Sequence, residues 1–299
     1  MDDDKRTLDG LIAQYELEPA LADVYVEGQR DKAILEWFLG RHSIDQVSVY
    51  AIDLIDIPET VVANLGLNTG SNRSKVAALS VELHSHFADQ IRVLCVIDRD
   101  FEDYIPMVST ASSSLCLTDG NSMETYAFNE GSLSKFTSVV LGGFPLSPRA
   151  LMDCLRRVLR ILYAIRLTNE KLGWGMEWLP IKKYISISGF EIEFHKDAFV
   201  LAYLQKNGRV ARRGLFERKL QTYLTELPDD CTRTSRGHDL SEVMLPLINR
   251  LRKDRKFPNA AALEGALLGT LESHDLESYP LFQRILRMVA QANELPSTV

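Results

Sequence analysis

The sequence predicts an α/β protein, with a mostly parallel sheet flanked by helices in its first half and a mainly helical domain in its second half. In the first half, short apolar segments of strand length alternate with longer segments of helical periodicity, as in parallel sheets covered by helices. One segment, IRVLCVID, is continuously apolar, which is typical of a strand buried on both faces. Beyond GGFPLSP, residues 142–148, helical patterns dominate. We therefore expect domains at residues 1–145 and 146–299.

The elements of the first domain follow from local sequence patterns. Strands are expected at VYVEG, VSVYAID, IRVLCVID and SLCLTD. Helices are expected at residues 5–17, at RDKAILEWFLG, where apolar residues share one face, and at about 73–88, after the polar loop LNTGSNRSK. A further helix is expected to begin at SMETYAF, with Ser122 as its cap.

The second domain is expected to contain six helices and, at YISISGFEIEF, a segment compatible with a pair of strands. The predicted helices cover residues 149–168, about 196–206, 213–226, 239–252, 259–270 and 279–293.

Composition places the chain among ordinary globular proteins. Of its 299 residues 45% are hydrophobic and 25% charged, enough apolar surface for a sizeable core. The four cysteines form no CxxC pair, so neither a zinc motif nor a disulfide framework is indicated. The sequence has no apolar run of the roughly 20 residues that cross a bilayer, and its first residues are acidic, unlike a signal peptide. We expect a cytoplasmic protein without a membrane partner.

Charge is distributed unevenly along the chain, although the net charge is only −7. Residues 1–148 carry a net charge of −13, residues 149–256 carry +9, and residues 257–299 carry −3. This asymmetry fits an acidic site that concentrates cations, joined to a basic surface that attracts phosphates. Chance variation between helical surfaces is the alternative explanation.

Acidic residues follow the ends of several predicted strands. Glu27 ends the first strand, Asp98 and Asp100 follow the buried strand on one side of an extended chain, and Glu124 follows the next. Asp31 can face the same cavity as Glu27 if a helix begins at about residue 29 and the intervening glycine permits a tight turn. Oxygen ligands without histidine favour Mg²⁺ or Mn²⁺ over zinc. Alternatively, each acid caps a helix or lies in a solvated turn, and this applies most to Glu124.

The motifs VYVEGQRD and VLCVIDRD, in this order, resemble the signature of the Toprim domain. In that domain, an apolar strand ends in Glu-Gly, an acid follows four residues later, and a second strand ends in Asp-x-Asp. The resemblance covers roughly residues 20–130. With GSNRSK and TDGNSMETY added, the chain looks like the AriB-type Toprim effectors of anti-phage PARIS systems, which are related to the overcoming-lysogenization-defect nucleases.

The resemblance implies a Toprim-like catalytic domain that binds Mg²⁺ through Glu27, Asp31, Asp98 and Asp100, with Glu27 also a general acid or base. Two such ions can activate a water molecule and stabilise the leaving oxygen of a phosphodiester. Lys75, at a helix start, could touch a phosphate oxygen, although GSNRSK lacks the spacing of a nucleotide-binding P-loop.

The basic second half contains the candidate substrate-binding residues. In RTSRGHDL, Arg236 and His238 precede or begin a helix, where anions bind favourably, or else they are ordinary loop residues. Tryptophans near Lys182 and Lys183 could stack on an unpaired base, or belong to the core. Further phosphate contacts are expected in KNGRVARR at Arg212 and Arg213.

Two classes of function therefore compete. The first is a Mg²⁺- or Mn²⁺-dependent endonuclease; the resemblance implies a toxic effector of antiviral defence that is held by an AriA-like ATPase sensor partner and cleaves tRNA rather than DNA. Its active form is expected to be a homodimer, because a nuclease of this size must span a structured substrate. The second is a non-catalytic regulatory or interaction protein with a structural metal site. A DNA-cleaving Toprim nuclease is a variant of the first class.

Overall fold

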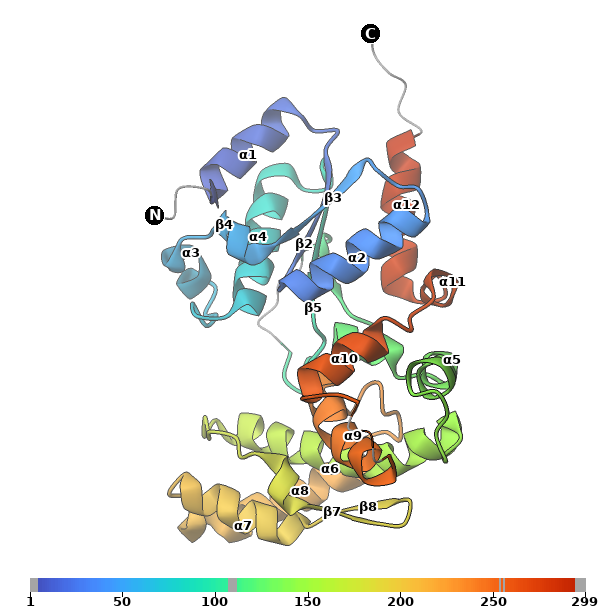
Figure 1. Ribbon diagram of the computed structural model, residues 1–299. Coiled ribbons are helices and arrows are strands. Elements are labelled where there is room, and N and C mark those ends of the chain that lie inside the picture. The colour runs from blue at the N-terminus through green and yellow to red at the C-terminus, as the bar shows by residue number, and fades with distance from the viewer. Residues whose placement is uncertain (1–4, 107–111, 253, 255, 294–299) are drawn as a thin grey trace. The chain divides into compact units, whose positions relative to one another are not determined.

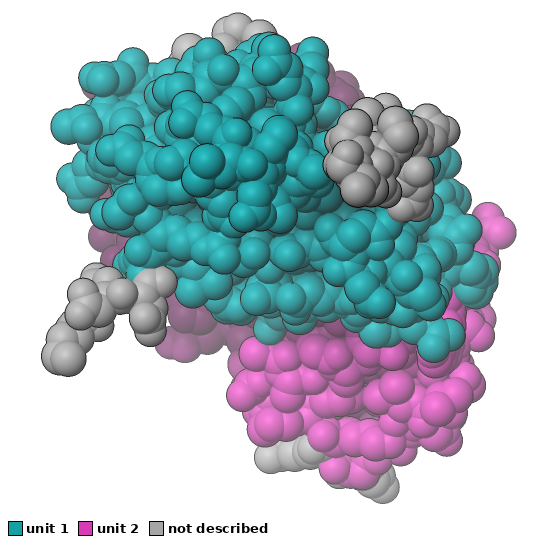
Figure 2. All heavy atoms as spheres, turned by 90° about the horizontal axis from the view of Figure 1, so that it is seen from above, with its two compact units in different colours: residues 1–119, 273–299 teal, residues 120–272 magenta. Residues whose placement is uncertain are grey.

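The computed structural model describes residues 5–106, 112–252, 254 and 256–293. The chain divides into two compact units, coloured separately in Figure 2: Met1–Asp119 with Ser273–Val299, and Gly120–Glu272. Ser273–Val299 thus groups with the first unit, although the sequence pattern had suggested its helix for the second domain. No helix of the described residues has the length and apolar character that crossing a bilayer requires.

The first unit contains a four-stranded parallel sheet in the order β3-β2-β5-β6. Its strands are β2 (Ala22–Val26), β3 (Val47–Ala51), β5 (Arg92–Ile97) and β6 (Leu115–Leu117), at the four places that the sequence predicts. Two short strands, β1 (Arg6–Thr7) and β4 (Ile55–Asp56), form a separate parallel pair. The mixed α/β class and the parallel sheet flanked by helices are thereby confirmed.

Helices cover both faces of this sheet (Figure 1). On one face, residues of α1 (Leu8–Leu17), α3 (Glu59–Asn64) and α4 (Asn72–Phe87) share a buried cluster with alternate residues of β5. On the other face lie α2 (Gln29–Arg41) and α12 (Pro280–Asn293), which meet through Phe38 and Phe282, with ring centroids 4.7 Å apart. Burial on both faces explains why β2 is apolar almost throughout.

The second unit is mainly helical and is organised around the 25-residue helix α6 (Pro148–Leu172). This helix begins where the Ser147 side chain accepts a hydrogen bond from the Ala150 amide, and ends at Gly173, whose φ of 60° is left-handed. It packs against α8, α9 and β8. The other elements are α5 (Glu130–Lys135), β7 (Ile185–Ser188), β8 (Glu191–Phe194), α7 (Lys196–Lys206), α8 (Arg213–Glu226), α9 (Gly237–Leu251) and α10 (Ala260–Leu268).

Short helical turns complete both units. In the first unit these are η1 (Ile52–Leu54) and α11 (Ser273–Leu276). In the second they are η2 (Met123–Ala127), η3 (Phe136–Val140), η4 (Ile181–Tyr184) and η5 (Val210–Arg212). The helix expected at SMETYAF is therefore a single 3-10 segment, η2, and Ser122 makes no side-chain cap there. Its hydroxyl instead accepts a hydrogen bond from the Gly237 amide at 3.2 Å.

Candidate metal and catalytic sites

The strand order places the ends of β2 and β5 side by side. Val26 is paired in register with Val96, so Glu27 follows β2 where Asp98 follows β5. The chain proceeds from β2 outward to β3 on one side, whereas β5 and β6 lie on the other side. The order of the sheet therefore reverses between β2 and β5, and in open α/β sheets ligands bind at such a reversal, beyond the carboxyl ends of the strands.

Glu27 is held at this position by the neighbouring strand end. Its Oε1 accepts a hydrogen bond from the Asp98 amide at 2.8 Å and lies 3.8 Å from Nη1 of Arg73. Burial raises the pKa of Glu27 to about 7, although the Asp98 hydrogen bond and the Arg73 charge both lower it. The charges of Asp100 and Asp31 raise the pKa further. A carboxyl group with a pKa near neutrality can both accept and donate a proton at physiological pH.

Asp31 caps helix α2, as in the alternative explanation by which each acid caps a helix rather than binding a metal. Its Oδ2 accepts a hydrogen bond from the Gly28 amide at 3.1 Å, as expected for an acid in the first helical turn. Gly28 has a φ of −149°, an extended conformation open to every residue, and a Cβ there would only touch Asp31 at 3.8 Å. The chain bends at residues 27–28 between β2 and α2, but this bend does not require a glycine at residue 28.

The Asp98–Asp100 turn has an unusual backbone. Asp100 has a φ of 44°, in the left-handed region, so the two side chains do not follow an extended chain as the sequence analysis assumed. Arg99 fixes the turn to the end of β6: its amide donates to Thr118 Oγ1 and its Nε to the Thr118 carbonyl, both at 3.0 Å. Left-handed non-glycine residues cost about 1–3 kcal/mol and concentrate at functional sites.

Arg73, which is not among the predicted site residues, contacts several of the acids. Its Nη2 lies 2.6 Å from Glu102 Oε1, and its Nη1 donates to the Asp98 carbonyl and lies 3.6 Å from Asp100 Oδ2. Next to it, the Asn72 side chain donates to the Glu27 carbonyl at 2.9 Å. The first turn of α4 thus packs against both strand ends.

Lys75 lies two residues beyond Arg73, in the same first turn of α4, and is half-buried. Among the residues that the structure describes, its ammonium group has no ion-pair or hydrogen-bond partner. The ammonium group of Lys75 could therefore contact a phosphate, as its expected role requires. The guanidinium of Arg73, by contrast, is paired with the acids. The catalytic role of Lys75 stays a prediction.

Glu124 lies in the second unit, where it meets two residues from distant parts of the sequence. Single ligand atoms of Glu124, His238 and Glu264 lie within 4.8 Å of one another and could hold a metal ion. His238 Nδ1 is 3.0 Å from Glu264 Oε2, which also accepts a hydrogen bond from Ser241 at 3.1 Å. Glu264 is only 3% exposed. Glu264 is the one charged residue in the apolar helix AAALEGALL, and a charge at a buried position of this kind indicates a partner or a ligand.

Gly237 allows Glu124 to approach this cluster. A Cβ at residue 237 would lie 2.5 Å from the Cβ of Glu124 and 2.4 Å from its Oε2, closer than atoms of real side chains approach. The glycine is therefore required by close packing, because a larger residue would push Glu124 away from the other two ligands.

Asp239, the acidic residue of RTSRGHDL, has a structural role. Asp239, 2% exposed, accepts two hydrogen bonds from Arg166, at 2.7 and 2.9 Å, which is a bidentate ion pair. The same guanidinium lies 3.6 Å from the ring centroid of Trp178. The guanidinium of Arg166 thereby covers one face of Trp178, and Trp174 stacks on Phe216 of α8. Both tryptophans thus pack against side chains of the second unit.

The expected substrate-binding cations have different surroundings. Lys182 and Lys183 are exposed on η4, and Arg212 is exposed at the end of η5. Arg213 pairs with Glu217 at 2.7 Å, one helical turn away. Arg236 is the N-cap residue of α9 and is half-buried. Their contacts with nucleic acid stay predictions.

The two acidic groups differ in how closely their ligands converge. Among the described residues, the metal-ligand grouping within 4.8 Å is Glu124, His238 and Glu264, not the strand-end carboxylates. Arg73 lies among the latter and neutralises part of their charge. The donors at the strand ends are all oxygens, which fits Mg²⁺ or Mn²⁺, whereas the imidazole of the second group favours a transition metal.

Comparisons with known proteins add no identification. The sequence matches no protein-family model, and a search of curated proteins finds no similar sequence. Fold and sites therefore define only a class: a two-unit α/β protein with carboxylates at the switch point of a parallel sheet.

Proposed function

We propose that the protein is a Mg²⁺- or Mn²⁺-dependent nuclease of the Toprim type. The observation that carries this proposal is the meeting of Glu27 with the Asp98–Asp100 turn at the reversal of strand order between β2 and β5. Glu27 accepts a hydrogen bond from the amide of a neighbouring strand end, lies near Arg73 and has a raised pKa. An acid that only ends a strand at the surface is not expected to combine these features. Perturbed carboxyl groups of this kind concentrate at active sites.

The charge balance favours a bound cation. The carboxyl groups of Glu27, Asp100 and Glu102 share the one charge of the Arg73 guanidinium, so these four side chains together keep a negative excess. A phosphodiester would be repelled by this excess unless a divalent ion joined it. Glu27, Asp31, Asp98 and Asp100 would hold the ion. When bound, Mg²⁺ supplies charge stabilisation for the phosphoryl oxygens and a more acidic water molecule.

The side chains supply the remaining chemistry. Glu27 would act as the general acid or base, since burial raises its pKa to about 7 in the metal-free protein. Lys75 places its charge at a phosphate oxygen. Arg73 is a positioning residue that holds the two strand ends together before substrate arrives.

The substrate proposal rests on the basic second part of the chain and on the Toprim resemblance. Residues 149–256 carry a net charge of +9, and Lys182, Lys183 and Arg212 are exposed there. Such a surface binds the phosphates of any nucleic acid. We assign tRNA as the substrate, with an ATPase sensor partner that restrains a toxic effector of antiviral defence and a homodimer as the active form, because the resemblance implies them.

Cleavage assays test this function. The purified chain is incubated with total tRNA and with plasmid DNA, with Mg²⁺, Mn²⁺ or EDTA. We expect metal-dependent tRNA cleavage that Glu27→Gln abolishes and that Glu36→Gln, at an exposed site on α2, leaves intact. Cleavage of DNA alone would favour a DNA-specific Toprim nuclease. Full cleavage by Glu27→Gln, or none by the wild type with either metal, contradicts the proposal.

The Glu124–His238–Glu264 group supports one second candidate, a non-catalytic regulatory protein with a structural ion in its helical unit. The two functions make opposite predictions for two substitutions. If the protein is regulatory with a structural ion, His238→Ala should lower its stability and Glu27→Gln should have no effect on function. If it is a nuclease, Glu27→Gln should abolish cleavage while the protein stays folded. Thermal melting and cleavage by both variants distinguish them.

A further inference from the structure

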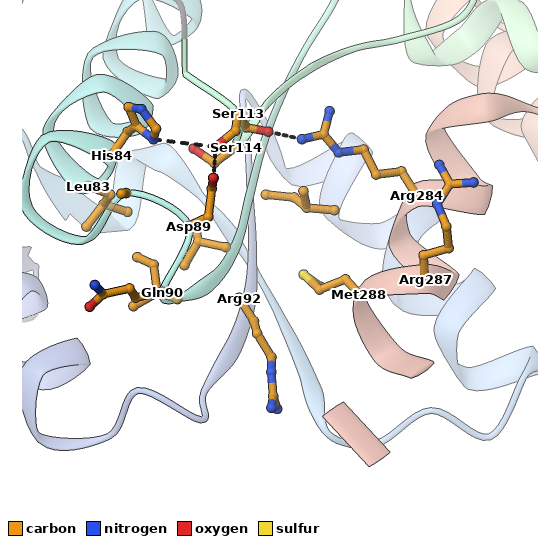
Figure 3. A pocket seen from close by; sticks show the side chains of 14 residues that line it. Leu83, His84, Asp89, Gln90, Arg92, Ser113, Ser114, Arg284, Arg287 and Met288 are labelled. Carbon is orange, nitrogen blue, oxygen red and sulfur yellow. Dashed lines mark hydrogen bonds between the residues drawn. The ribbon is translucent and has the colours of Figure 1, made fainter. Parts of the chain in front are cut away.

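The first unit has a cavity of about 660 Å³ at the other end of its central strand. It is formed by the end of α4, the start of β5, the residues before β6 and one side of α12, as Figure 3 shows. The cavity volume lies in the range of roughly 300–1,000 Å³ that small-molecule sites occupy. Its lining residues include Leu83, His84, Asp89, Arg92, Val93, Leu94, Ser113, Arg284, Arg287 and Met288.

Arg284 and Arg287 bring positive charge to this cavity, and a third arginine, Arg92, lines it but extends away from them (Figure 3) and donates to the Ala20 carbonyl at 3.4 Å. Arg284 and Arg287 are separated by one turn of α12 and so lie on the same side of the helix, and Arg92 begins β5. Within the described residues, none of the three forms an ion pair with a carboxylate. Arg284 donates to the Ser113 carbonyl, which directs its guanidinium across the cavity (Figure 3).

The opposite wall of the cavity is polar but is not arranged for catalysis. Ser113 Oγ donates to Asp89 Oδ1, and His84 Nδ1 lies 3.4 Å from the same hydroxyl. In a hydrolytic serine site the histidine lies between serine and acid, so that it can accept the serine proton. Here the serine lies between histidine and acid. The cavity is therefore suited to binding. Among its described lining residues, Asp89 is the only one with a carboxylate.

The lining also includes apolar residues. Leu83 of α4, Val93 and Leu94 of β5 and Met288 of α12 border the cavity and are themselves buried. A ligand that matches both features has an anionic group for the arginines and a flat or apolar body for these residues. Arginine binds phosphate oxygens through paired N–H groups, which makes phosphate the anion of choice.

We propose that this cavity is a binding site for a small molecule that joins a phosphate group to an apolar ring system, as a mononucleotide does. The site is separate from the carboxylates at the strand ends, because Arg92 begins β5 and Asp98 follows its other end. A strand rises about 3.3 Å per residue, so the six residues of β5 keep the two sites about 20 Å apart. The proposal does not depend on the nuclease function.

Isothermal titration of the full chain in EDTA tests the site, since EDTA removes any contribution from a metal. The probes are AMP, ADP, ATP, GMP and GTP, with inorganic phosphate and a short oligoribonucleotide for comparison. We expect saturable binding of at least one mononucleotide, one per chain, and weaker binding of inorganic phosphate. Absence of mononucleotide binding, equal binding of inorganic phosphate, or binding of the oligoribonucleotide alone would overturn the proposal.

Substitutions assign the binding to this cavity. The pair Arg284→Gln and Arg287→Gln should weaken mononucleotide binding at least tenfold. The pair Arg218→Gln and Lys219→Gln, which removes the same charge from exposed positions of α8, should not. Asp89→Asn removes the opposing carboxylate and should tighten binding several-fold, an independent readout if the arginine variant does not fold. Unchanged affinity in the arginine variant, or in Asp89→Asn, refutes the assignment.

Discussion

The substitution Glu27→Gln should stabilise the protein at neutral pH while abolishing its activity. Glutamine keeps an oxygen that can accept the hydrogen bond from the Asp98 amide, at 2.8 Å in the structure, and removes the charge. Burial raises the pKa of Glu27 from 4.5 to about 7. Because a pKa unit corresponds to about 1.4 kcal/mol, ionising Glu27 costs the folded state about 3 kcal/mol in the absence of metal.

The sign of this effect depends on pH. Below pH 4.5 Glu27 is protonated in both the folded and the unfolded state, so the wild type and the variant should have similar stability. Between pH 4.5 and about 7 the unfolded state releases the proton first, and the wild type loses stability relative to the variant. The difference should be small at pH 5 and reach its maximum above pH 7.

Calorimetric melting of both proteins between pH 5 and 8.5, with and without Mg²⁺, measures this difference. Mg²⁺ should stabilise the wild type more than the variant, because a bound cation favours the ionised carboxylate. A variant that is less stable than the wild type at every pH would refute the reasoning, since Glu27 would then be a structural acceptor rather than a strained functional acid. An equal response to Mg²⁺ would also refute it.

Three further substitutions test the second unit. Gly237→Ala should destabilise it by about 1–3 kcal/mol through the clash with Glu124, whereas Gly265→Ala, where a Cβ meets nothing within 4 Å, should be neutral or stabilising in urea unfolding. Asp239→Asn should cost about 3 kcal/mol in the same assay, because Arg166 loses its buried anionic partner; a cost near zero would mean that water replaces the carboxylate. His238→Ala should remove one equivalent of bound Mn²⁺ or Zn²⁺ measured by mass spectrometry after dialysis, and an unchanged metal content would show that the cluster holds no ion.

The sheet could be predicted because its strands carry a strong local signal. A strand that is buried on both faces needs a continuous run of apolar residues, as in RVLCVI, and a polar residue marks the point where it leaves the core. The pairing of β2 with β5 did not follow from that signal, because neighbours in a sheet are chosen by tertiary packing. Only the structure shows that the strand order reverses where Glu27 and Asp98 meet.

The site could be predicted only where sequence spacing is short. Glu27 and Asp31, or Asp98 and Asp100, are near neighbours in the chain, and their motifs are visible. Arg73 reaches the same place from a helix that the sequence separates from both, so its role depends on how α4 packs. The same limitation hid Glu264 from the prediction: its partner His238 lies on another helix.

The last helix shows a related limit. The amphipathic pattern of residues 279–293 predicted α12 correctly as a helix, but an apolar face does not specify which core it covers. Phe282 packs on Phe38 of α2, so this helix covers the sheet of the first unit after the chain has completed the second. The arginines of α12 consequently line the cavity beside β5.

A buried acid by itself does not mark a functional site in this protein, and three acids show why. Asp23, inside β2, also has a pKa raised by burial, but it is 4% exposed and accepts a hydrogen bond from Tyr15 at 2.6 Å. Asp239 is equally buried, and its charge is matched by Arg166.

Glu27 differs from both in three respects. Its side chain is 22% exposed, it lies where strand order reverses, and the left-handed Asp100 adds backbone strain beside it. Structural acids relieve their burial through partners that match them, whereas Glu27 keeps an incompletely balanced charge at an accessible strand end. That imbalance costs stability, and a bound cation would remove it. The metal-free protein should therefore gain stability from Glu27→Gln at neutral pH, and under the proposed function it should lose its activity with the same substitution.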